Sequence, residues 1–142
     1  MIWDRVKESL EEYFLREDFS FEFHHGEDPS ETECHGSLKI ERGLREQPVM
    51  IFIESEDNIN FLRISSPLVP VERCKQEQLI RLLEQNMSWI NTTIGIVNRD
   101  VVYTTTLPTR EFESDSAALG DSIVKVARRT DQMALLLFGR DR

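Results

Sequence analysis

The fold of this chain is decided by residues 78–107, which read QLIRLLEQNMSWINTTIGIVNRDVVYTTTL. Four apolar side chains early in this stretch recur at intervals of three and four residues: Leu79, Leu82, Leu83 and Met87. This spacing predicts a helix with one apolar stripe. From residue 92 onward, β-branched residues dominate on both sides of the polar turn at residues 98–100. The stretch therefore predicts a helix that is followed directly by a β-hairpin.

The sequence outside this stretch supplies further strands and two more helices. The predicted helices cover residues 2–17, 73–86 and 115–138, and the predicted strands cover residues 19–25, 34–41, 49–54, 59–64, 92–97 and 101–107. The predicted inward stripe of the last helix contains Ala118, Leu119, Ile123, Val126, Ala127, Thr130, Ala134 and Leu137. Gly139 is expected to end this helix, because glycine adopts the left-handed conformation that helix ends favour.

These elements follow one another in the order α-β-β-β-β-α-β-β-α. Runs of strands joined by short turns favour an antiparallel sheet with the helices packed on one face. Pro67 and Pro70 are expected to bracket a connector, because proline cannot donate to the ladder of a sheet interior. No repeat or linker interrupts residues 1–142, so we expect a single α+β domain.

Negative charge is concentrated in the first half of the chain. Residues 1–71 hold 16 acidic against 7 basic side chains, residues 72–142 hold 10 of each, and the net charge is −9. Such a surface repels a phosphate backbone, which argues against nucleic-acid binding. It attracts a basic protein and speeds the encounter, although the same charge can also serve solubility alone. We therefore expect another protein as the partner, with a basic one favoured.

Cysteine content and hydropathy indicate the compartment. Two cysteines, Cys34 and Cys74, with no signal segment ahead of them, are typical of the reducing cytoplasm. No apolar run approaches the roughly 20 residues that a membrane helix requires. We expect a cytoplasmic protein that does not associate with membranes.

The strongest candidate for chemistry is a group of four potential metal ligands: His24, His25, Cys34 and His35. Side chains alternate across a strand, so at most two of the four share a face in a regular register. A structural zinc site needs four ligands and a catalytic one needs three. A metal-binding enzyme or sensor built on this group stays open as the alternative hypothesis.

Other catalytic patterns are missing from the sequence. The six glycines are scattered and form no phosphate-binding loop, and there is no G-x-S-x-G elbow. Neither cysteine lies in the surroundings that activate a thiol. We therefore expect a protein that is not an enzyme and has no catalytic residues, no cofactor and no metal.

The end of the second predicted helix carries the candidate contact residues. Met87, Trp89 and Ile90 fall where the helix ends and a strand is about to begin. One interpretation places them in the core. In the other, part of this set is exposed and forms, with Leu82, a dimer or partner surface, for which Trp and Met are favoured residue types.

The element order and two segments are similar to those of a known family. LLEQNM (residues 82–87) leads into a strand-turn-strand, and VARRTDQMALLL (residues 126–137) forms the closing helix, with Ala127 and Asp131 ahead of a final apolar turn. In these features the chain resembles the YbjN-like family, which shares its fold with type III secretion chaperones. The resemblance implies a small acidic protein, often dimeric, that binds an extended stretch of another protein or regulates stress responses. The strand over residues 19–25 is a departure from the secretion chaperones.

Our leading hypothesis is a non-enzymatic, chaperone-like or regulatory protein-binding module. It would hold an extended segment of a partner protein through an exposed sheet edge and an apolar patch. The unpaired N–H and C=O groups of an edge strand offer main-chain hydrogen bonds to an incoming strand, and side-chain pockets add selectivity. We also expect a homodimer that forms through the second helix or the hairpin.

Overall fold

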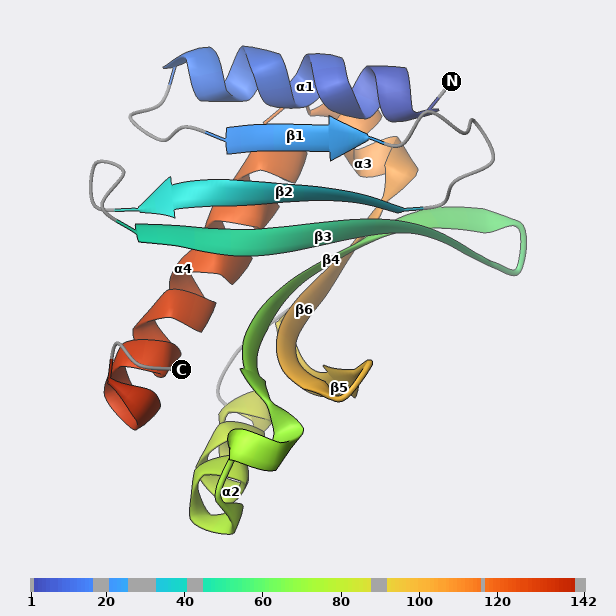
Figure 1. Cartoon of the computed structure of the whole chain (residues 1–142). Coiled ribbons are helices and arrows are strands. Elements are labelled where there is room, and N and C mark those ends of the chain that lie inside the picture. The colour runs from blue at the N-terminus through green and yellow to red at the C-terminus, as the bar shows by residue number, and fades with distance from the viewer. Residues whose placement is uncertain are drawn as a thin grey trace.

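The computed structural model describes residues 2–16, 21–25, 33–40, 45–87, 92–115 and 117–139 (Figure 1). The elements, in chain order, are α1 (Ile2–Arg16), β1 (Phe21–His25), β2 (Glu33–Ile40), β3 (Arg45–Glu56), β4 (Ile59–Pro70), η1 (Val71–Arg73), α2 (Gln76–Glu84), η2 (Gln85–Met87), β5 (Thr93–Val97), β6 (Asp100–Pro108), α3 (Thr109–Ser114) and α4 (Ala118–Phe138). The predicted order is confirmed. One short helix, α3, is added, and the last long helix begins at residue 118 instead of 115.

The strands form one antiparallel sheet in the order β1-β2-β3-β4-β6-β5. Two-residue turns join β3 to β4 and β5 to β6, and all four turn residues have positive φ: Asp57, Asn58, Asn98 and Arg99. Turns of this hand match the twist of the flanking strands, and Asn and Asp tolerate the conformation best among residues with a side chain. The α+β class and the antiparallel sheet are therefore confirmed.

Arg99 is the turn residue least suited to its backbone, with φ at 68°. The expected effect of Arg99→Gly is a rise in the free energy of unfolding of about 0.5–1 kcal/mol, because glycine adopts this conformation without steric cost. The loss of the Arg99–Glu72 ion pair costs little, since both side chains are exposed. Urea denaturation checks this, and Arg99→Val, which adds β-branching, should lower stability instead.

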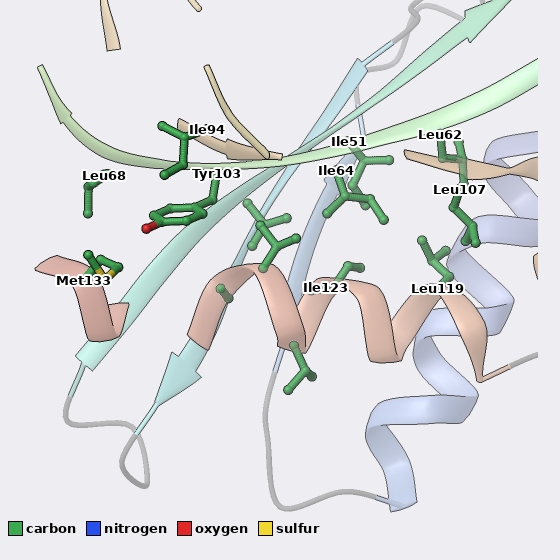
Figure 2. Close-up of a cluster of buried hydrophobic side chains, with 14 of the residues drawn as sticks. Ile51, Leu62, Ile64, Leu68, Ile94, Tyr103, Leu107, Leu119, Ile123 and Met133 are labelled. Carbon is green, nitrogen blue, oxygen red and sulfur yellow. The ribbon is translucent and has the colours of Figure 1, made fainter. Parts of the chain in front are cut away.

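The core lies between the sheet and α4. In Figure 2, Leu119 and Ile123 of α4 face Ile51, Ile64 and Leu107 of the strands, and all five side chains are buried. Six of the eight residues of the predicted inward stripe are buried, while Ala118 and Leu137 are half-buried against the core. Gly139 follows the helix with φ at 66°, as expected of a helix-ending glycine.

The first helix packs on the start of the last one. Val6 and Leu10 of α1 are buried in the core, and the Tyr13 hydroxyl donates a hydrogen bond of 2.7 Å to Asp121 Oδ1. The Tyr13 ring lies directly against Gly120, where a Cβ atom would overlap it. Gly120 therefore allows a close approach that any larger residue would block.

The prediction that Pro67 and Pro70 lie in a connector is wrong, because both lie within β4. The ladder between β3 and β4 ends at the pair Met50↔Ser65, so β4 has only β6 as a strand neighbour beyond that point. A proline there removes no bond from a β3–β4 ladder. The β4–β6 register also shifts between Pro67 and Val69. This bulge allows two consecutive residues, Leu68 and Val69, to enter the core.

A buried polar cluster fills the gap where β3 and β4 part. The Gln47 side chain is fully buried and donates through Nε2 to Ser66 Oγ at 2.8 Å and to the Pro67 carbonyl at 2.9 Å. Ser66 Oγ in turn donates to the Pro48 carbonyl at 2.6 Å. Side chains thus replace the ladder bonds that the two strands no longer exchange, which gives the Pro48 and Pro67 carbonyls hydrogen-bond donors.

No helix among the described residues is long and apolar enough to cross a membrane.

Candidate functional site

The second helix exposes apolar side chains on its outer surface. Leu82 is fully buried in the core, and the half-buried Leu79 packs against the core. Ile80 and Leu83, by contrast, are 49% and 48% exposed, and Met87 at the end of η2 is 92% exposed. The prediction of a single apolar stripe is therefore wrong. The helix has an inner apolar side at positions 79 and 82 and an outer one at positions 80, 83 and 87, which also share a helix face.

Two hydrogen bonds from one side chain hold α2 in place. The backbone N–H of Lys75 donates to Gln78 Oε1 at 2.8 Å, which caps the start of the helix. Gln78 Nε2 donates to the Leu137 carbonyl at 3.0 Å, which ties α2 to the last turn of α4. The outer side of α2 is thus positioned by one hydrogen bond to α4 and by the burial of Leu82.

The strand β5 is an edge of the sheet and lies beside η2, the turn that follows α2. Ile94 and Ile96 share one face of the sheet, but Ile94 is buried whereas Ile96, nearer the β5–β6 turn, is 57% exposed. Asn86 connects the helix exit to this edge, because the Ile94 N–H donates to Asn86 Oδ1 at 2.6 Å. Arg129 of α4 donates to Thr92 Oγ1 at 2.7 Å, which anchors the residue before the strand.

The exposed apolar residues therefore gather at one end of the molecule. We define the distal surface as six exposed residues from α2, η2, β5 and the last turn of α4: Ile80, Leu83, Met87, Ile96, Leu135 and Leu136. Figure 1 shows these elements at the end of the molecule opposite α1. In the described part of the chain, the only other exposed large hydrophobic residue is Ile59, which begins β4 after the β3–β4 turn.

The predicted contact residues are divided by the structure. Met87 lies on the distal surface, whereas Leu82 is buried and cannot contact a partner, because the helix turns it toward the core. Trp89 and Ile90 lie outside the described residues. The sequence pattern also missed Ile80 and Ile96. The sequence did contain a signal for Ile80. It directly follows Leu79 of the inner side, and adjacent helix positions point about 100° apart, so Ile80 points in a different direction from Leu79.

The predicted metal group lies on β1 and β2. The register places His24 opposite His35 and His25 opposite Cys34, so the four positions divide into two pairs on opposite faces, as the alternation predicted. Their side chains lie outside the described residues. Among the residues that are described with side chains, no three His, Cys, Asp or Glu gather at one point. The metal hypothesis stays a prediction.

Burial raises the pKa values of two potential nucleophiles, the Cys74 thiol and the Tyr103 hydroxyl. Burial raises the pKa of the Cys74 thiol, which therefore stays protonated at neutral pH. Burial also raises the pKa of the Tyr103 hydroxyl far above its ordinary value, against a smaller opposing effect of the Arg129 guanidinium. Both groups are thus held in their neutral forms at physiological pH.

A comparison with models of protein families finds no match for this sequence, and a comparison with curated proteins finds no relative. The resemblance to the YbjN-like family therefore stays a prediction, and the geometry of the distal surface carries the functional argument.

Proposed function

We propose that this protein is a non-enzymatic binding module that holds an extended segment of a partner protein at the distal surface. The observation that supports this proposal is the clustering of exposed apolar side chains on α2, η2 and β5, beside an edge of the sheet. Apolar groups that gather at one end of a soluble domain are typical of interaction sites. A sheet edge beside them offers main-chain hydrogen bonds to an incoming strand.

The exposure of these side chains is energetically costly. A Leu or Ile with half of its surface in water forgoes about 1 kcal/mol of the stabilisation that full burial would give. Ile80, Leu83 and Ile96 each lie near this degree of exposure, and Met87 is almost fully exposed. A partner that covers them recovers this free energy. Met87 suits such a role because its flexible thioether adapts to irregular surfaces.

Charge differs between the two halves of the chain. The acidic excess lies in residues 1–71, whereas residues 72–142, which include the distal surface, are balanced. A basic partner would therefore be attracted by the first half while its apolar residues contact the second. We place this function in the cytoplasm, where the thiol of Cys74, which is free in the structure, stays reduced.

The double substitution Leu83→Glu/Met87→Glu tests the surface. We expect at least a tenfold loss of the proteins that the wild-type chain captures from the native cytoplasm, measured by mass spectrometry of the retained fraction. Charges placed in an apolar contact must be desolvated, which costs several kcal/mol. The chain should still fold, with the free energy of unfolding lowered by no more than about 1 kcal/mol, because Met87 is almost fully exposed and Leu83 is half exposed.

Ile59→Glu is the matched control, because Ile59 is 44% exposed but lies away from the distal surface. It should capture the same proteins as the wild type. An identical set of captured proteins for all three chains would refute the proposal.

The same variants test the proposed homodimer. Light scattering behind a sizing column should give twice the 16.6 kDa chain mass for the wild type and Ile59→Glu. The Leu83→Glu/Met87→Glu variant should give the monomer mass. A wild-type monomer at high concentration would exclude the dimer and leave binding to other proteins as the remaining function.

A further inference from the structure

The outer edge of β5 has a defined set of outward-pointing backbone groups. Asn98 and Arg99 form a two-residue turn that the pair Val97↔Asp100 closes. The closing pair of such a hairpin is hydrogen-bonded, and bonded and non-bonded pairs alternate along an antiparallel ladder. Ile96 and Ile94 are therefore in non-bonded pairs, and their N–H and C=O groups point away from β6. The Ile94 N–H confirms this direction, since it bonds to Asn86.

One amide group already occupies this edge. The Ile94 N–H donates to Asn86 Oδ1 at 2.6 Å, and Asn86 Nδ2 lies 3.5 Å from the Ile94 carbonyl, within reach of a weak second bond. A side-chain carboxamide has the same C=O and N–H groups as a peptide bond. These are the two bonds that the N–H and C=O groups of one residue on a neighbouring antiparallel strand would make with Ile94.

We propose that the Asn86 carboxamide occupies the place of the N–H and C=O groups of a partner residue, so that an extended segment binds the β5 edge by displacing it. This inference rests on the proposed function and identifies its partner as a strand that pairs with Ile94 and Ile96. Two apolar side chains flank the path of that strand: Ile96 on β5 itself and Met87, the residue after Asn86, are both exposed. The distal surface thus combines main-chain pairing with apolar contacts, and Asn86 keeps the edge closed until a strand arrives.

Asn86 and an incoming strand compete for the backbone groups of Ile94, and this competition should change the affinity for the strand by a measurable factor. A net protein hydrogen bond contributes about 1 kcal/mol, and the longer second bond adds little, so the two Asn86 bonds together contribute about 1–1.4 kcal/mol. Removing the competitor should therefore raise the affinity for a strand about five- to tenfold. The bond between Asn86 and the Ile94 N–H should also slow the exchange of that amide hydrogen with solvent.

The test measures the binding of a synthetic strand to three variants. The probe is a capped, fluorescein-labelled peptide with the sequence of β6, Asp100–Pro108, followed by two lysines, because this sequence already pairs with the inner edge of β5. Asn86→Ala should bind it about five- to tenfold more tightly than the wild type in fluorescence anisotropy. Asn86→Asp keeps the acceptor for the Ile94 N–H and should bind no more tightly than the wild type, because a charged acceptor makes the stronger hydrogen bond. Asn86→Ala/Ile96→Pro should not bind, because proline removes the outward donor without breaking the β5–β6 ladder.

Three results would overturn the inference. These are equal affinity of Asn86→Ala and the wild type, tight binding that survives Ile96→Pro, and absence of peptide binding to every variant. Amide exchange gives an answer that needs no ligand: in Asn86→Ala the Ile94 hydrogen should exchange faster, and an unchanged rate would show that Asn86 does not close the edge. If the Leu83→Glu/Met87→Glu variant loses its partners while Asn86→Ala behaves as the wild type, the binding function stands and only the role of Asn86 is wrong.

Discussion

Gly120→Val is expected to lower the free energy of unfolding by about 3 kcal/mol. The Tyr13 ring of α1 occupies the space that a Cβ atom at this position would need. The ring would have to move, and its hydroxyl would lose the 2.7 Å bond to Asp121. Val6 and Leu10 on the same helix would be partly withdrawn from the core. Thermal or urea unfolding, followed by circular dichroism, measures the loss.

The control for Gly120 is a glycine that has space around it. A Cβ at Gly95 would meet nothing within 4 Å, so Gly95→Ala should leave stability unchanged or raise it slightly. A second test predicts a change in stability of the opposite sign for a substitution at Gly120. In a Tyr13→Ala background, Gly120→Ala should stabilise the protein by up to about 1 kcal/mol, since alanine is the better helix former once the ring is gone. A destabilising effect in that background would contradict the close-approach explanation.

Gln47→Leu is expected to cost about 2–4 kcal/mol of folding free energy, although leucine is more hydrophobic. Gln47 Nε2 is a donor to both Ser66 Oγ and the Pro67 carbonyl, and all of these atoms lie at a site where β3 and β4 no longer pair. Leucine has no N–H group to donate to the Pro67 carbonyl. This loss falls at a site where the Gln47 side chain is fully buried. Urea denaturation measures the change, and the m-value should stay constant if only the native state is affected.

Ser55→Ala is the comparison for Gln47. The Ser55 hydroxyl donates to Asn60 Oδ1 at 2.6 Å, but this bond lies in the exposed part of the β3–β4 hairpin. Water can replace the lost partner there, so the change in stability should be within about 0.5 kcal/mol. Equal losses for the two substitutions would mean that the buried cluster has no special role in joining the strands.

Local patterns in the sequence predicted most of the fold. Apolar spacing predicted the long helices, and alternation predicted the strands, because both depend on geometry that repeats along a single element. The same rule predicted that His24 and His25 fall on opposite faces, which the register confirms. What the patterns could not show was where one strand loses its neighbour. Pro67 is tolerated in β4 because β3 has already diverged, and this is a property of two strands together.

The candidate site was predicted only in part. Met87 could be named as a contact residue because an apolar residue at a helix exit has few core positions available. Leu82 and Leu83 are adjacent and chemically identical, so the sequence alone could not show which of them is buried. The role of Asn86 was missed entirely. Its side chain bonds to a residue eight positions further along, across a change from helix to strand that no periodic pattern spans.

The sheet order has a consequence for the chain while it is being synthesised. The strands β1 to β4 are adjacent in the sheet in the order in which they leave the ribosome, so they can pair early. The helix that covers their apolar face, α4, is the last described element, and β6 must first pair with β4 across the intervening α2 and β5. Val49, Ile51, Leu62 and Ile64 therefore face solvent on every ribosome until residues 118–138 have emerged. During that interval the nascent chain exposes the kind of apolar surface that promotes aggregation.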